Sequence, residues 1–60
     1  MMDKVNTLMQ YAVDQYGRDR HYEVSFGAST PTVLVTWPDG TAIAELWMLK
    51  NEIRKTVFGS

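Results

Sequence analysis

The sequence predicts an α+β domain with the element order α-β-β-(β)-α, in which two helices pack on one face of a small antiparallel sheet. The spacing of the apolar residues carries this prediction. They recur every three to four residues up to position 16, alternate with polar residues between positions 21 and 37, and return to a helical spacing after position 45. Because the chain has 60 residues, we expect positions 1–60 to form one small globular domain.

An amphipathic helix is expected over residues 2–16. A turn of about 100° per residue brings its apolar side chains into an arc of about 140°, which is wide enough to face a core. Gly17 follows this segment and is the usual residue type for a left-handed helix end. The apolar stripe consists of Met2, Val5, Leu8, Met9, Ala12, Val13 and Tyr16.

Two strands are expected next, over residues 21–27 and 32–37, joined by the small residues of the 27–31 connector. Each segment alternates apolar with polar side chains, as a half-buried strand does. The short connector predicts that the two strands pair as a hairpin. Their apolar positions are Tyr22, Val24 and Phe26, then Val33, Val35 and Trp37.

A turn is expected at residues 38–41, where Pro38 presets φ and Gly40 accepts a positive φ. Residues 41–45 fit either a brief third strand or the first turn of a final helix, and we favour the strand. A helix is then expected over residues 45–58. Its core stripe consists of Leu46, Leu49, Ile53 and Val57.

The predicted core joins both helical stripes to the inner face of the sheet. Removing these side chains from water is the main favourable contribution to folding in a domain of this size. We expect the following residues to be largely buried: Val5, Met9, Ala12, Tyr16, Val24, Phe26, Val35, Leu46, Leu49 and Ile53.

The composition excludes several classes of protein. Hydrophobic residues make up 45% of the chain and charged residues 22%, which are globular rather than disordered proportions. The chain has no cysteine and a single histidine, so we expect no disulfide, no metal site and no cofactor. A small domain without these supports often gains stability by association, and we therefore expect a homodimer.

Neither a signal peptide nor a membrane span is expected. No stretch approaches the roughly 18 consecutive apolar residues that a membrane helix needs, and the amphipathic start of the chain lacks the apolar run of a leader. We expect a cytoplasmic protein with no membrane partner.

Catalysis is not expected either. His21, Glu23 and Ser25 would share one face of the first strand. Alternate residues of a strand lie roughly 6–7 Å apart, which is too far for direct hydrogen bonds among all three. The glycines are isolated at turns rather than clustered as in a phosphate-binding loop. We therefore predict that the protein is not an enzyme.

Nucleic-acid binding is the alternative function. Two basic groups could contact phosphates, and the predicted element order is similar to that of the double-stranded-RNA-binding domain. That resemblance implies a lysine cluster at the start of the last helix, but residues 41–46 hold no lysine, and the net charge of −1 disfavours a phosphate-binding surface. The basic residues in question are Arg18, Arg20, Lys50, Arg54 and Lys55.

The aromatic residues point instead to protein–protein contact. A core of this size leaves little room for Trp37, Trp47, Tyr11 and Phe58 as well. On a helix, residues at i, i+4, i+7 and i+11 share one flank, and Trp and Arg are enriched at binding hot spots. The sequence leaves open whether the aromatic pair on this flank is core or interface. The predicted partner-binding residues are Trp47, Asn51, Arg54 and Phe58.

We therefore predict a small non-catalytic protein-binding module that acts as a regulator or inhibitor. Its partner would be a second copy of the chain or a host protein. Chains of this size class include regulators encoded by phages and mobile elements.

Overall fold

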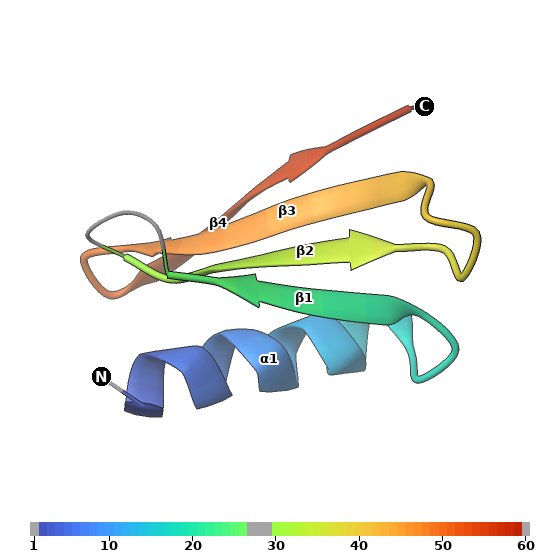
Figure 1. Cartoon of the computed structure of the whole chain (residues 1–60). Coiled ribbons are helices and arrows are strands. Elements are labelled where there is room, and N and C mark those ends of the chain that lie inside the picture. The colour runs from blue at the N-terminus through green and yellow to red at the C-terminus, as the bar shows by residue number, and fades with distance from the viewer. Residues whose placement is uncertain (1, 27–29, 60) are drawn as a thin grey trace.

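The computed structural model describes residues 2–26 and 30–59 as one helix and a four-stranded antiparallel sheet (Figure 1). The strands lie in the order β1-β2-β3-β4, so the sheet is a simple meander. The helix lies against one face of this sheet (Figure 1). The elements are α1 (Met2–Tyr16), β1 (His21–Ser25), β2 (Thr32–Thr36), β3 (Ala42–Leu49) and β4 (Glu52–Val57).

The first half of the predicted fold is confirmed. The helix has the predicted bounds, and the first two strands pair as a hairpin with Tyr22 opposite Val35 and Val24 opposite Val33. The strands end at Ser25 and Thr36, slightly earlier than predicted. The predicted strand end at Gly27 and the first part of the connector lie outside the described residues.

The predicted second helix is wrong. Residues 45–58 form the second half of β3, a two-residue turn and β4, so one helix rather than two packs on the sheet. The strand alternative for residues 41–45 is correct, because β3 begins at Ala42. The residue types of this segment favour a helix in isolation. Pairing of β3 with β2 on one edge and β4 on the other overrides that local preference.

The turn between β3 and β4 is tight. Leu49 pairs with Glu52, which leaves Lys50 and Asn51 as the two turn residues. Lys50 has a φ of 58°, a left-handed conformation that is rare for residues with a Cβ atom. A positive φ at the first of two turn residues is the feature of a type II′ turn, where glycine is the usual residue.

Replacing Lys50 by glycine is expected to stabilise the domain by up to about 1 kcal/mol. The substitution removes left-handed strain of about 1–2 kcal/mol, and the greater freedom of glycine in the unfolded chain offsets part of this gain. Thermal melts of Lys50→Gly and Asn51→Gly would test this, since the φ of Asn51 is not positive. A lower melting temperature for Lys50→Gly than for the parent would contradict the prediction.

The core lies between α1 and the two central strands, because the helix packs on β2 and β3. Partly buried side chains from α1, β1, β3 and β4 surround it. Alternation along each central strand sends every second side chain into this layer. The fully or nearly buried residues are Leu8, Ala12, Val33, Val35, Ala44, Leu46 and Met48.

The predicted core is correct in part. Ala12, Val35 and Leu46 are buried. Phe26 and Leu49 are exposed over 67% and 50% of their surface, so their predicted burial is wrong. Leu49 was assigned by helical spacing, but in a strand it lies on the opposite face from Leu46 and Met48. Phe26 follows the last residue of β1. The predicted residues that are partly buried are Val5, Met9, Tyr16, Val24 and Ile53.

A tyrosine ties β1 to the end of the helix. The Tyr22 hydroxyl donates to the carbonyl oxygen of Gly17 and lies 3.4 Å from that of Ala12. Gly17 has a φ of 88°, and its amide donates to the Val13 carbonyl at 2.8 Å, which ends the helix in the predicted left-handed form. Burial raises the pKa of the Tyr22 phenol. The hydroxyl therefore supplies a donor to the Gly17 carbonyl just past the helix end, where no further intrahelical donor follows.

Tyr22→Phe is expected to destabilise the domain by about 0.5–1.5 kcal/mol. The substitution keeps the ring in place but removes the hydrogen bond to the helix end. Chemical denaturation of the two proteins would measure the difference. Tyr11→Phe is the matched control, because no hydrogen bond of the Tyr11 hydroxyl occurs among the described residues. Equal stability of Tyr22→Phe and the parent would show that the hydroxyl makes no net contribution to the free energy of unfolding.

Candidate protein-binding surface

One face of the sheet is uncovered in the described part of the chain. The helix lies on the other face (Figure 1), where it meets the inward side chains of β2 and β3. Paired residues of an antiparallel sheet share a face, so the register identifies the outward side chains. We call this surface the open face. It consists of His21, Glu23, Ser25, Thr32, Leu34, Thr36, Ala42, Glu45, Trp47, Leu49, Glu52, Arg54 and Thr56.

Two rows of side chains cross the open face at right angles to the strands. Each row takes one residue from each strand, in register. Directly opposed side chains lie about 4.5–5.5 Å apart at Cβ, so neighbours within a row touch. The first row is Ser25, Thr32, Trp47 and Arg54, and the second is Glu23, Leu34, Glu45 and Thr56.

Trp47 and Arg54, two of the predicted partner-binding residues, are cross-strand neighbours. Trp47 is partly buried on a central strand, whereas the Arg54 side chain on the edge strand is 53% exposed. The Arg54 guanidinium forms an ion pair with Glu52 at 3.2 Å. Strand pairing, rather than the predicted helical flank, makes Trp47 and Arg54 neighbours on one face.

The other two predicted partner-binding residues lie away from this pair and from each other. Asn51 is in the β3–β4 turn, and Phe58 follows the far end of β4, where its amide donates to the Ile43 carbonyl at 2.8 Å. The six residues of β4 lie between the two positions, which makes seven steps along an extended chain and a span of roughly 23 Å. The predicted four-residue site on one helix flank is therefore wrong as a single cluster.

The open face carries an excess of carboxylates. It contains three carboxylates, those of Glu23, Glu45 and Glu52, and one guanidinium, that of Arg54. Within the described ranges 2–26 and 30–59, Arg54 and Glu52 form the one ion pair, which leaves Glu23 and Glu45 without a cation. Glu45 is also partly buried, since it lies on a central strand between Leu34 and Thr56. Glu45 is not among the predicted site residues, because the predicted helix begins at this position.

The basic residues of the nucleic-acid alternative do not form one surface. Arg18 and Arg20 lie in the connection from α1 to β1, whereas Lys50 lies in the β3–β4 turn at the opposite end of the sheet (Figure 1). The Arg20 guanidinium stacks 3.9 Å from the centroid of the Trp37 ring. Lys55 is in register with Leu46 and therefore projects from the helix-covered face.

The predicted polar face of β1 is present as expected. His21, Glu23 and Ser25 are all exposed and lie at alternate positions of one edge strand. Among the described residues, no group of three or more histidine, aspartate or glutamate side chains is arranged to hold a metal ion. The one helix in this part of the chain is too short and too polar to cross a bilayer.

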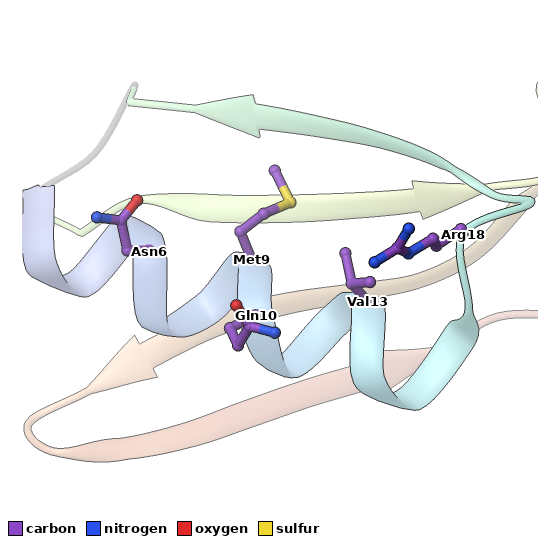
Figure 2. A pocket seen from close by; sticks show the side chains of 5 residues that line it. All are labelled: Asn6, Met9, Gln10, Val13 and Arg18. Atoms are coloured by element: carbon purple, nitrogen blue, oxygen red, sulfur yellow. The ribbon is translucent and has the colours of Figure 1, made fainter.

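Two shallow hollows lie outside the open face. Figure 2 shows the first, of about 500 Å³, along α1, where the Met9 and Val13 side chains project from the helix and the Arg18 side chain extends beside them. Its lining also includes two side-chain amides and no carboxylate or imidazole. The second, of about 330 Å³, lies at Arg18–His21 beside Pro38. Neither of these two hollows is lined by a serine, threonine or cysteine side chain.

The turn beside the second hollow is held by its own hydrogen bonds. The Asp39 carboxylate accepts from the Thr41 amide at 2.9 Å, and this bond is the main cause that lowers the pKa of Asp39 from its ordinary value of 3.8. The amide of Gly40 donates to the Trp37 carbonyl at 2.8 Å. The predicted turn is confirmed. The lowered pKa of Asp39 is explained by hydrogen bonds within the turn and does not indicate a ligand site.

Comparisons of the chain with protein-family models, with curated proteins and with solved structures give no match.

Proposed function

We propose that this domain is a small non-catalytic protein-binding module, acting as a regulator or inhibitor, and that the open face is its contact surface. The observation that carries the proposal is the position of Trp47. Its indole lies on a central strand, beside Arg54, on a face that no other described element covers. Trp and Arg are the residue types most often found at the energetic centre of interfaces.

The surroundings of Trp47 support the same function. The open face combines the apolar side chains of Leu34 and Leu49 with hydroxyl groups at Thr32 and Thr36. A mixture of apolar and polar side chains, rather than a uniformly apolar surface, is typical of a non-obligate protein–protein interface. The carboxylates on this face disfavour nucleic acid, because they repel phosphates.

A photo-cross-linking experiment would test the proposed surface. Benzoylphenylalanine placed at Thr56 lies on the open face, and the same residue at Gln10 lies on the exposed side of α1. We expect the probe at position 56 to form a discrete adduct with one partner protein in cells that produce the domain. The probe at position 10 is the control and should give no such adduct. Adducts from position 10 alone, or from neither position, would contradict the proposal.

We also propose that the domain self-associates through the β4 edge. β4 is an edge strand, so its outer backbone groups lack strand partners within the described chain. Its helix-side residues Ile53 and Val57 lie beyond the strands that α1 covers, and Val57 is 56% exposed. Pairing of two β4 strands would satisfy the backbone groups and cover this apolar flank.

Sedimentation at micromolar concentration is expected to give a species of roughly twice 6.9 kDa. Val57→Glu should shift that species to the monomer, because it places a charge at the proposed contact without changing the core. Gln10→Glu, which adds the same charge on α1, is the control and should remain dimeric. A parent protein that sediments as a monomer at these concentrations would contradict the proposal.

A further inference from the structure

Resting on the proposed function above, we propose that the partner of the open face is a basic protein segment, whose lysine or arginine side chains pair with Glu23 and Glu45 across Leu34 and beside Trp47. The juxtaposition of two unpaired carboxylates with an indole on one uncovered sheet face carries this inference.

Two glutamates flank a leucine on the open face. Glu23, Leu34 and Glu45 lie in register on three neighbouring strands. Neighbouring strands are about 4.8 Å apart, so the Cα atoms of Glu23 and Glu45 lie roughly 10 Å apart, with Leu34 between them. Trp47 lies two residues from Glu45 on the same face, roughly 6–7 Å along the strand. A segment lying over Leu34 would therefore meet a carboxylate on either side and an aromatic ring next to it.

A partner that covers this face would remove the Glu23 and Glu45 carboxylates from water. Neither carboxylate has an ion pair among residues 2–26 and 30–59, because the Arg54 guanidinium lies against Glu52. Glu45 is already partly buried on its central strand. A partner that covered Leu34 and Trp47 without supplying a cation would bury an unpaired charge, which is strongly unfavourable. A lysine or arginine from the partner removes that penalty, and the face of Trp47 adds a cation–π contact.

The negative charge of the open face disfavours a second copy of the chain and a nucleic acid as its partner. A second copy laid face to face would bring together six carboxylates and two guanidinium groups, because each open face has three of the former and one of the latter. Phosphates of a nucleic acid would meet the same excess of negative charge. Charge complementarity therefore selects a partner segment of net positive charge.

The inference can be tested with three capped five-residue peptides of matched length, Lys-Leu-Lys-Leu-Lys, Gln-Leu-Gln-Leu-Gln and Glu-Leu-Glu-Leu-Glu. Each is titrated into the isotope-labelled domain while backbone amide shifts are followed by NMR. We expect the lysine peptide to shift the amides of Leu34, Glu45 and Trp47, and to bind about tenfold more tightly than the glutamine peptide. Raising the salt from about 0.05 to 0.5 M should remove most of this difference.

Charge-neutralising variants sharpen the test. Glu45→Gln and Glu23→Gln are each expected to weaken binding of the lysine peptide by about two- to fivefold, and to leave the glutamine peptide unaffected. Asp14→Asn, which makes the same change at an exposed position of α1, is the matched control and should bind like the parent.

Two outcomes would overturn the inference. If the glutamine peptide binds through the same amides as tightly as the lysine peptide, the open face is a docking surface, but its partner is not selected by charge. If no peptide shifts these amides while the cross-link from position 56 still forms, the basic partner is wrong and the proposed function stands. Loss of that cross-link as well would remove the proposed function too.

Discussion

Replacing Leu46 by alanine is expected to destabilise the domain by about 2–5 kcal/mol, the usual cost of a large-to-small change in a packed core. Leu46 has no exposed surface and lies on β3, which is paired on both edges and covered by α1. Its loss would leave a cavity between the helix and the two central strands. In a chain of this size the melting temperature should fall by at least about 8 °C, measured by circular dichroism.

Leu49→Ala is the control, and the pair also discriminates between a strand and a helix at this position. In the strand, Leu49 faces outward and is half exposed, so its replacement should cost about 1 kcal/mol or less. On a helix, residues 46 and 49 would share one buried stripe, and both substitutions would be equally damaging. Similar large losses of stability in both variants would therefore contradict the strand.

The first half of the fold follows from the sequence because each local signal has a single interpretation. The apolar stripe of residues 2–16 has a clear helical period, and Gly17 then permits the left-handed end that the structure shows. In β1, polar and apolar residues alternate strictly, and in β2 a short run rich in β-branched residues follows the connector, so both segments favour a strand over a helix. Local preference and tertiary packing agree in these segments.

The second half could not be predicted in the same way, because its local signals conflict. Residues 42–49 are rich in alanine, leucine, methionine and glutamate, all good helix formers, and such short apolar runs match both periods. The turn that reverses the chain uses Lys50 and Asn51 rather than a glycine-containing pair, so the usual hairpin signal is absent. What stabilises β3 is pairing with strands on both sides, and no property of the segment alone contains that information.

The same conflict between helix and strand signals explains which of the predicted site residues lie together in the structure and which do not. Trp47 and Arg54 were selected for their residue types, and a strand pair brings them together as closely as a helix flank would have done. Asn51 and Phe58 share a flank with Trp47 only on a helix, and the strand separates them. Glu45 became visible only when the register placed it beside Leu34 on the open face.

Trp47→Ala is expected to weaken partner binding by at least about 2 kcal/mol, a loss of roughly thirtyfold or more. The indole lies at the middle of the proposed contact surface, between Thr32 and Arg54, where truncation would leave a gap that the partner cannot fill. The change should cost less folding stability than Leu46→Ala, because the ring projects away from the core layer. Partner affinity by calorimetry and the melting temperature should be measured on the same protein.

Trp37→Ala provides the matched control, since it removes the same side chain at the end of β2. Trp37 is 44% exposed and lies under the Arg20 guanidinium, away from the centre of the open face. Its loss should leave partner affinity within about twofold of the parent, as expected for a residue outside the energetic centre. Arg54→Ala should fall between the two tryptophan variants, because its guanidinium is exposed and already paired with Glu52. Two outcomes would contradict the assignment of Trp47: unfolding of Trp47→Ala would place the indole in the core, and parent-like binding by that variant would place the contact surface elsewhere.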